Sequence, residues 1–570
     1  MTSSEQRLQA ARAVPVSRQP RDRSPARPRD LTERLNVFAK AAVWAVFIAL
    51  IGIAAFGQFY DARFSGLIST TAMEIGDVAQ QLRYGEGFST RVIHLPGLTY
   101  GQPNEKGVVP EMLHAPLYPY LLSWLFRARE GGDAAVALFN GLMFLLTGAV
   151  IYAIARLLWD RVVGLLSVAV YFVSVDAIGL ALTAAGASLA GLLFTIAIWA
   201  ALRNRQTTPA SPGESQAAAR VNPLVWPALI GGAFGLTYLA GLTSLLLVIP
   251  LVVLATATGP RRRQQVALIA GVAAVVMLPW AVRNLQVSGT VTPALAKYVL
   301  LTHTQTYPGE SVFQQMPDQV PSPIAFVLQR PGEILSKFGG GVRMLYRRVP
   351  DLLNPYLFPF LIMGGFVFAH GSLKRSLWRV VIAMFALQTL SICVYRLDIN
   401  GIGLLLPIAM CLAVGALVEA LRRTEASRLV QILVGAIIFG LVLFPGVSSA
   451  IVGGKMPANR SLASLGIIHD RLTEDAVIAT DNPSAVAWYA YKQAVALPTT
   501  PAGLDELAQR GVKVDYIYLS HVFGAQLGNE ATRPWNEALR SKEGRKSLGK
   551  FLPLPYGEML IDRFNKLEIQ

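Results

Sequence analysis

Residues 138–158 read LFNGLMFLLTGAVIYAIARLL, a run in which Arg156 is the one charged side chain. As an α-helix this run is about 31 Å long, which is close to the thickness of the hydrocarbon core of a bilayer. Runs that are as apolar and as long, or nearly so, recur at residues 37–57, 224–256, 266–282 and 432–447. A soluble helix interrupts its apolar residues with polar ones at the helical period, because one of its faces meets water. The sequence therefore predicts an α-helical polytopic membrane protein.

The composition of the whole chain supports this prediction. Of its 570 residues 53% are hydrophobic and 15% are charged, and the mean hydropathy is +0.44. A soluble protein carries roughly a quarter charged residues. The formal net charge is +16, and the excess of Lys and Arg lies in the N-terminal tail and in the short loops. Basic residues in those places set topology and meet anionic lipid head groups, so we expect membrane lipids as partners and no nucleic acid.

The basic segments predict how the chain is threaded through the membrane. The tail, residues 1–36, is rich in Arg, Pro and Ser, so we expect it to be disordered, basic and cytoplasmic. The other basic loops should share that side, and they are residues 203–220, 261–263, 374–379 and 422–428. This leaves the outer loops 58–133 and 284–351, together with residues 454–570, on the outer face of the inner (plasma) membrane. The transmembrane region is then residues 37–453.

The number of spans depends on two segments. Residues 117–126 are short for a span, and Pro116 and Pro119 lie at their start, so we predict a helix on the membrane surface. This gives about eleven spans, with the N-terminus cytoplasmic and the C-terminus outside. The count rises to about thirteen if residues 284–351 contain two further helices that cross.

The C-terminal part, residues 454–570, differs in pattern from the rest. Residues 476–481, 494–497 and 514–520 read as strands, and they alternate with helical stretches at 484–492 and 502–510. Strands that alternate with helices are typical of βαβ units with a parallel sheet. We therefore predict a small extracytoplasmic α/β domain.

The first outer loop is the best candidate for a functional site, because long ordered connections are usually functional. Residues 71–84 predict a helix in which Glu74 and Asp77, three residues apart, share one face. A carboxylate that faces an outer cavity can act as a general base towards an acceptor hydroxyl or amine. The alternative is that both acids form the solvated face of an amphipathic helix.

Two arginines at predicted outer span ends form a second group of candidates. Arg283 and Arg396 stand where the positive-inside rule disfavours basic residues. A guanidinium pairs bidentately with a lipid phosphate, which is one reason to keep an arginine there. The alternatives are a snorkelling side chain or, for Arg396, a pair with Asp398. The six histidines are scattered, so we predict no metal site built on histidine and no cofactor; a hard cation bound by carboxylates is the alternative.

Several stretches, taken in order, resemble the GT-C class of membrane glycosyltransferases. Residues 72–88 (AMEIGDVAQQLRYGEGF) are similar to the first-loop pattern of that class, in which an acid precedes A-x-x-L-x-x-G-x-G-F. The remaining similar stretches are His114–Leu122 (HAPLYPYLL), Pro279–Asn284 (PWAVRN) with Gly289 and Pro293, Arg396–Pro407, and the C-terminal run from Val477 to Tyr518. The most similar patterns are those of the protein O-mannosyltransferases and the lipid A aminoarabinose transferases.

This resemblance implies an activity and a set of site residues. It implies transfer of a sugar from a polyprenyl-phosphate donor to a lipid, glycan or protein acceptor, with inversion, at the outer face of the membrane. Glu74 matches the acidic position of the class, with Asp77 or Asp61 as alternative bases. The residues expected to bind substrate are Arg91, His114, Arg283 and Arg396.

A second reading belongs to a different class of protein. Thr70–Ala72 stand where many members of the GT-C class carry an Asp-Glu pair. A non-catalytic membrane scaffold or lipid-binding subunit that keeps the fold is therefore the alternative. A transporter fits less well, because the predicted spans are almost free of the ionisable residues that such a function needs.

Overall fold

The computed structural model describes residues 31–128, 131–183, 186–207, 222, 224–256, 261–368, 372–395, 399–452, 460–523, 533–564 and 566. The chain divides after residue 50, and residues 51–570 form one compact unit. The first helix, α2 (Leu31–Arg63), begins six residues before the predicted start of the first span at residue 37. Most of the tail that was predicted to be disordered lies outside the described residues.

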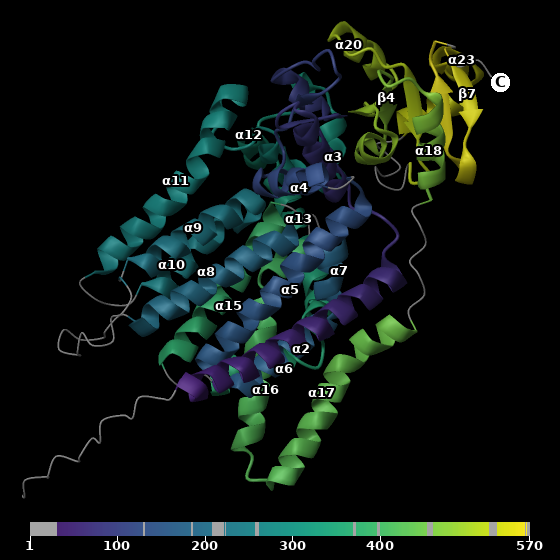
Figure 1. Ribbon diagram of the computed structural model, residues 1–570. Helices are drawn as coiled ribbons and strands as arrows, with labels where there is room; N and C mark the ends of the chain where they lie inside the picture. Colours follow the sequence, from purple (N-terminus) through teal and green to yellow (C-terminus); the bar gives the residue numbers. More distant parts are fainter. Residues whose placement is uncertain are drawn as a thin grey trace, which may run out of the picture. The chain divides into compact units, whose positions relative to one another are not determined.

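Long apolar helices make up most of the compact unit (Figure 1). Among the described residues six helices are long and apolar enough to cross a membrane. They are α2, α5 (Asp133–Leu158), α8 (Ala187–Thr207), α11 (Arg262–Ser288), α15 (Ser372–Val394) and α17 (Arg428–Ile451). A seventh span is formed if α6 (Arg161–Val173) and α7 (Val175–Thr183), which meet at 56°, are counted as one. The polytopic helical fold is therefore confirmed.

Shorter helices occupy the remaining predicted spans. They are α9 (Val225–Ala240), η3 (Leu242–Leu247) with α10 (Val248–Ala255), α14 (Phe358–Met363) with η7 (Gly364–Phe368), and α16 (Leu406–Arg423). Between α11 and α14 the described chain forms the short helices η4 (Ala296–Leu301), η5 (Ser311–Gln314), η6 (Pro317–Gln319) and α12 (Pro323–Gln329), followed by α13 (Pro331–Leu352). None of these is long and apolar enough to span a membrane, and the same holds for the shorter helices at the remaining predicted spans. The described residues thus contain six helices that could cross, or seven with the bent pair, and the counts of about eleven and about thirteen stay predictions.

The basic loops gather at one end of the helix bundle, called here the basic end. Arg422 pairs with Asp160 at 2.6 Å, and Lys374 pairs with Glu419 at 3.1 Å. Arg205 donates a hydrogen bond to Ser376 in the same region. These contacts place the basic loops on a common side, as their charge predicted. That this side is cytoplasmic remains a prediction.

The opposite end, called here the loop end, carries the first loop. Its helix α3 (Thr70–Tyr84) begins where the Ser69 hydroxyl accepts the N–H of Ala72, and it ends at Gly85, whose φ is +86°. Because glycine has no Cβ, it adopts this left-handed conformation without strain. Helix α4 (Leu117–Ala128) has 12 residues and is too short for a span. Between the two helices lie the short strands β1 (Ser89–Thr90), β2 (Val92–Ile93) and β3 (Val109–Pro110).

The C-terminal region contains a six-stranded sheet in the order β2-β5-β4-β6-β8-β7. The predicted strands β4 (Val477–Thr480), β5 (Gln493–Ala496) and β6 (Tyr516–Leu519) are parallel, while β7 (Lys550–Pro553) and β8 (Met559–Asp562) add an antiparallel edge. The helices of this region are α18 (Leu462–Arg471), α19 (Pro483–Ala485), η9 (Val486–Ala490), α20 (Gly503–Gln509), α22 (Arg533–Arg540) and α23 (Lys542–Leu548). The predicted helix at 484–492 is thus formed by α19 and the π-helix η9.

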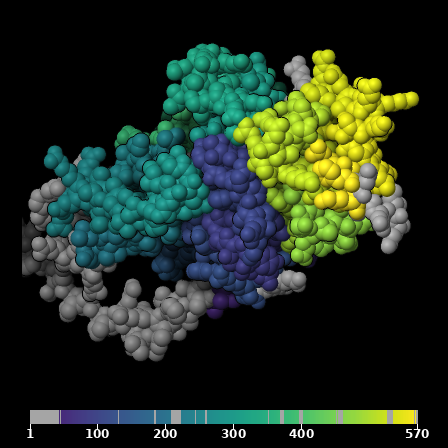
Figure 2. Space-filling model, turned by 90° about the horizontal axis from the view of Figure 1, so that it is seen from above, coloured from purple at the N-terminus to yellow at the C-terminus, as the bar shows by residue number. Residues whose placement is uncertain are grey.

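The first loop supplies one edge strand of this sheet. Strand β2 pairs in parallel with β5, with Val92 opposite Ala494 and Ile93 opposite Val495. The sequence did not predict this pairing, because a strand of two residues carries no recognisable period. In Figure 2 the blue residues of the first loop lie directly against the yellow-green residues of the C-terminal region. The two regions therefore share one sheet.

Candidate active site

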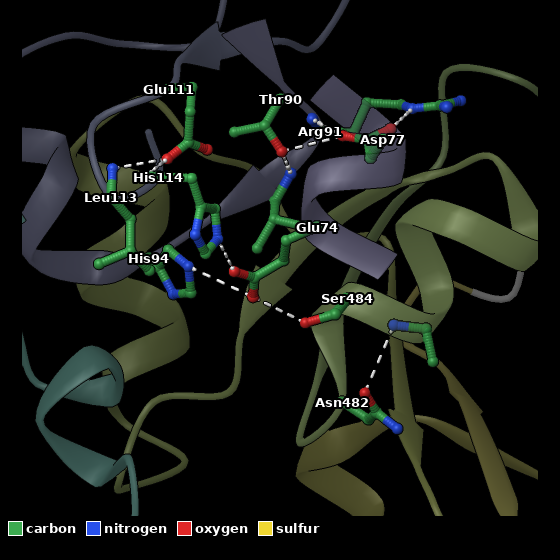
Figure 3. A network of polar contacts seen from close by, with 12 residues as sticks. Glu74, Asp77, Thr90, Arg91, His94, Glu111, Leu113, His114, Asn482 and Ser484 are labelled. Atoms are coloured by element: carbon green, nitrogen blue, oxygen red, sulfur yellow. Dashed lines mark hydrogen bonds and ion pairs between the residues drawn. The ribbon is translucent and has the colours of Figure 1, made fainter. Parts of the chain in front are cut away.

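Glu74, on helix α3, is the centre of a buried polar network (Figure 3). One carboxylate oxygen lies 2.6 Å from Nε2 of His114, and the other accepts a hydrogen bond of 2.7 Å from the Ser484 hydroxyl. His94 approaches the same carboxylate at 3.6 Å through its own Nε2. Glu74 is 7% exposed, so water hydrates its carboxylate very little. The three partners His114, Ser484 and His94 take the place of that water.

The shared sheet brings two of these partners to Glu74. His94 follows directly after β2, and Ser484 lies four residues after the end of β4. Both strands are parallel to β5, so their carboxyl ends lie at the same edge of the sheet. Polar residues at that edge of an α/β sheet commonly form binding sites. The network therefore joins the first loop to the C-terminal region.

The electrostatics of the network keep Glu74 ionised. Burial alone raises the pKa of a carboxyl group, but the charge of His94 and the hydrogen bonds from His114 and His94 outweigh it. The pKa of Glu74 consequently lies well below its ordinary value. For His94 burial acts in the opposite direction, yet the Glu74 carboxylate raises the pKa of the imidazole above its ordinary value. Glu74 and His94 thus stabilise each other as an ion pair.

His114 links this network to a cavity of about 170 Å³ at the loop end. His114 is one of the residues that line the cavity, whereas Glu74 is not. Because an ionised carboxylate only accepts hydrogen bonds, the proton of a neutral His114 sits on Nε2 and leaves the lone pair on Nδ1. No described residue forms a hydrogen bond with that Nδ1. The described lining also includes Ser69, Thr71 and Tyr395, and it contains no Asp, Glu, Lys or Arg.

A second, more apolar cavity adjoins the first. Its volume is about 560 Å³, and it lies among η3, η4 and the end of α15. The two cavities share four lining residues, which are Leu242, Ala296, Ser391 and Tyr395. Lys297 lies on its rim, is exposed, and donates a hydrogen bond of 2.9 Å to the Tyr100 hydroxyl. Lys297 is the one basic residue in the described lining of this second cavity, which is called the channel below. An apolar cavity with a cation at its edge is suited to the tail and head of an anionic lipid.

Asp77, predicted as an alternative base, has a different role in the structure. It is fully buried and accepts hydrogen bonds from the Arg91 backbone (2.7 Å), from Nε of Arg91 (2.8 Å) and from the Thr90 hydroxyl (2.9 Å). Helix α3 is buried from Ala72 to Leu82, so the alternative in which both acids form a solvated face is wrong. The expectation that both carboxylates face the outer cavity is wrong as well, because neither of them lines it. Arg91, expected to bind substrate, is the ion-pair partner of Asp77.

Neither Arg283 nor Asp61 forms a hydrogen bond with Glu74. Arg283 donates to the carbonyl oxygens of Glu111 (2.6 Å) and Phe88 (3.0 Å), and its guanidinium lies 5.0 Å from the centre of the Trp280 ring. It therefore holds the first loop against α11. Asp61 is exposed in the last turn of α2. Arg396 lies outside the described residues.

Several residues of the site could not be found from the sequence. Asp133, at the start of α5, accepts hydrogen bonds from Trp488 (2.7 Å) and Tyr489 (2.9 Å) of the C-terminal region. The Trp488 ring lies against Gly76 of α3, where an added Cβ would come within 2.8 Å of it. The sequence carries no signal for these contacts or for the contact of Ser484 with Glu74. Each of them joins residues that are hundreds of positions apart. Lys297 had a weak signal as a basic residue in a predicted outer loop.

The ion pair of Glu74 with His94 predicts the pH range in which the folded protein is most stable. The pKa of Glu74 is lowered by folding, so its carboxylate stabilises the fold fully at a pH above its ordinary pKa of about 4.5. This contribution is lost as the pH falls through the pKa of Glu74 in the folded protein. The pKa of His94 is raised by folding, so its imidazolium stabilises the fold fully at a pH below its ordinary pKa of about 6.5. This contribution is lost as the pH rises through the pKa of His94 in the folded protein. We expect the melting temperature to peak between these values, and Glu74→Gln to flatten the peak. An unchanged profile in the variant would contradict the pairing.

Comparisons with known proteins identify the fold. No protein-family model matches the chain, and no curated protein matches its sequence. The structure is similar to the oligosaccharyltransferase AglB of Archaeoglobus fulgidus, solved with an inhibitory peptide and a dolichol-phosphate. The TM-score is 0.56 at 12% identity, over 92% of this chain and 74% of that one.

A second similar structure is that of ArnT from Cupriavidus metallidurans. Its apo form gives a TM-score of 0.57 at 13% identity, over 93% of this chain and all of that one. The form bound to undecaprenyl phosphate gives the same values. AglB and ArnT are both GT-C glycosyltransferases, so the fold is the GT-C fold that the sequence resemblance predicted.

Proposed function

We propose, starting from the GT-C fold, that this protein is a membrane glycosyltransferase. It takes a sugar from a polyprenyl-phosphate donor and transfers it, with inversion, to a lipid, glycan or protein acceptor at the outer face of the plasma membrane. One observation carries the proposal. His114 is held by the buried Glu74 carboxylate at the wall of a cavity that adjoins an apolar channel.

The channel and its rim suit the donor lipid. AglB and ArnT were solved with a dolichol-phosphate and with undecaprenyl phosphate, which are polyprenyl phosphates. In this protein the isoprenoid chain would occupy the channel of about 560 Å³, in contact with Leu245, Leu246 and Val394. Lys297 would pair with the phosphate, and the sugar would then enter the adjoining cavity beside His114.

The chemistry assigns His114 and Glu74 to one catalytic pair. The acceptor oxygen bonds to the anomeric carbon while its proton passes to Nδ1 of His114. The bond between the anomeric carbon and the phosphate oxygen breaks, and its electrons leave with the polyprenyl phosphate. Glu74 stabilises the imidazolium that forms, and Ser484 holds the carboxylate in place. His114 is thus the general base, and Glu74 assists it through Nε2, the nitrogen that does not take the proton. The ion pair of Asp77 with Arg91 keeps the first loop in position.

Replacing Lys297 with Gln should weaken binding of a polyprenyl phosphate by roughly tenfold to a hundredfold, because a charge-assisted pair is lost. Lys542→Gln removes an exposed positive charge from α23 and serves as the matched control. Binding can be measured by native mass spectrometry in detergent micelles. Equal affinity in both variants would place the phosphate elsewhere.

The direct test of the activity is transfer of radiolabelled sugar by the purified protein in liposomes. Polyprenyl-phosphate sugars serve as donors, and lipid, glycan and peptide acceptors are offered in turn. We expect one donor and acceptor pair to give product in the wild type and none in His114→Gln. Product that forms equally with both proteins would exclude His114 from the reaction.

A second candidate function rests on the lining of the cavity. Among its described residues there is no carboxylate, and Ser69 and Thr71 stand beside the region where the GT-C pattern carries acids. A scaffold or lipid-binding subunit would bind the polyprenyl phosphate in the channel without transferring its sugar. Binding of donor lipid without transfer to any acceptor, together with full activity of a GT-C enzyme in the same assay, would favour this reading.

A further inference from the structure

Three arginines on helix α13 form a basic cluster that the site does not use. Arg343, Arg347 and Arg348 are all exposed, and the first two lie one helical turn apart. The exposed apolar side chains Tyr346 (83%) and Leu335 (70%) lie within about 80° of Arg343 round the helix, on the side away from Arg348. None of the three arginines forms an ion pair with a described side chain.

Two buried residues of α13 anchor it to the protein. Leu345 is buried, and Lys337 donates hydrogen bonds of 2.9 Å each to the carbonyl oxygens of Leu300 and Tyr395. Tyr395 directly follows the end of α15, so Lys337 fixes the first half of α13 at the level where α15 ends. Arg343 and Arg347 lie about 160° round the helix from Leu345 and face outwards, whereas Arg348 lies about 60° from Leu345, at the edge of the buried side, and is still exposed.

The end of α13 reaches further along the helix bundle. Asn354, just after α13, donates a hydrogen bond of 2.8 Å to the carbonyl oxygen of Val442. Val442 lies inside α17, nine residues before its end at Ile451, which is about 14 Å along the helix. Arg343 and Arg347 lie between the levels set by Lys337 and Asn354. They are thus beside the apolar helices and not above them.

We propose that Arg343, Arg347 and Arg348 bind the phosphate of an anionic phospholipid in the leaflet at the loop end. A guanidinium exposed beside apolar spans is costly unless an anion pairs with it, and such residues mark functional sites in membrane proteins. Phosphate accepts bidentate hydrogen bonds from arginine, while Tyr346 and Leu335 contact the acyl chains. The cluster also lies in a predicted outer loop, where the positive-inside rule disfavours basic residues.

This lipid site is separate from the proposed donor channel, so its test needs no transferase activity. The triple variant Arg343→Gln, Arg347→Gln, Arg348→Gln is compared with wild type in phosphatidylcholine nanodiscs. The control variant, Arg540→Gln, Lys542→Gln, Lys546→Gln, removes the same charge from exposed residues of the C-terminal region. Phosphatidylglycerol, phosphatidylcholine and a polyprenyl phosphate are titrated separately, with binding followed by native mass spectrometry and folding by the melting temperature.

We expect the wild type and the control variant to bind phosphatidylglycerol in preference to phosphatidylcholine. The arginine variant should lose roughly fivefold in affinity for each arginine, of the order of a hundredfold in all, with an unchanged melting temperature in phosphatidylcholine. Equal affinity of all three proteins for phosphatidylglycerol overturns the proposal. So does selective loss of polyprenyl-phosphate binding, which would assign the arginines to the donor, or a change of oligomeric state, which would assign them to a second copy of the chain.

Discussion

Replacing Glu74 with Gln should lower sugar transfer by roughly 10²–10⁴-fold, the range that general acid–base assistance contributes. Gln fills the same space and can still accept a hydrogen bond from Ser484. It carries no charge, so it does not stabilise the imidazolium that forms when His114 takes the acceptor proton. Because Glu74 lies outside both cavities, the affinity for the donor should be almost unchanged.

The control for this prediction is Glu86→Gln, which makes the same chemical change in the same loop. Glu86 pairs with Lys106, whose side chain is 69% exposed, so its loss should change transfer little. Transfer is measured as initial rates of radiolabelled product, and donor affinity is measured separately by native mass spectrometry. A Glu74→Gln protein that transfers sugar at the wild-type rate would remove the catalytic pair from the mechanism.

Replacing Asp77 with Ala should cost about 3–5 kcal/mol of stability, the largest such effect that we expect from one substitution in the loop. Asp77 is fully buried, and its removal leaves the guanidinium of Arg91, 12% exposed, without its ion-pair partner. The backbone N–H of Arg91 also loses its acceptor. Residues 89–94 should then detach from α3, because β2 begins directly after Arg91.

Hydrogen exchange of the backbone amides measures this effect locally. Residues 89–94 should exchange faster in Asp77→Ala than in wild type, while the helices of the basic end should not change. Adding Arg91→Leu to Asp77→Ala should recover part of the loss, since it removes the unpaired buried charge. Asp505→Ala is the matched control, because Asp505 is 79% exposed and pairs with Arg563 on the surface. A loss below about 1 kcal/mol for Asp77→Ala would show that the pair is not structural.

Local patterns in the sequence predicted most of the elements that carry the site. The helix-like spacing of apolar residues made α3 recognisable, and the alternation of strands with helices predicted β4, β5 and β6. The charges of the loops predicted which loops meet at one end. These features depend on residues that are neighbours in the chain, so a short window contains the information for each of them.

The surroundings of Glu74 depend on contacts that no short window contains. Glu74 and Asp77 share a helix face in the sequence pattern, yet one is bound by His114 and Ser484 and the other by Arg91. Ser484 is 410 positions from Glu74, and it arrives through the pairing of β2 with β5. Helix α3 is buried against α4 of the same loop and against α19 and η9 of the C-terminal region. Sequence reasoning selected Glu74 and His114 as candidates, but it did not predict that they contact each other or that Glu74 lies outside the cavity.

A structure of the protein with a bound polyprenyl-phosphate sugar tests the proposed mechanism most directly. We expect the isoprenoid chain in the channel between η3 and α15, the phosphate beside Lys297, and the anomeric carbon in the cavity that His114 lines. Nδ1 of His114 should then lie within hydrogen-bond distance of the place from which an acceptor oxygen attacks. A donor lipid bound outside the channel, or a sugar held away from His114 with its anomeric carbon facing another side chain, would contradict it.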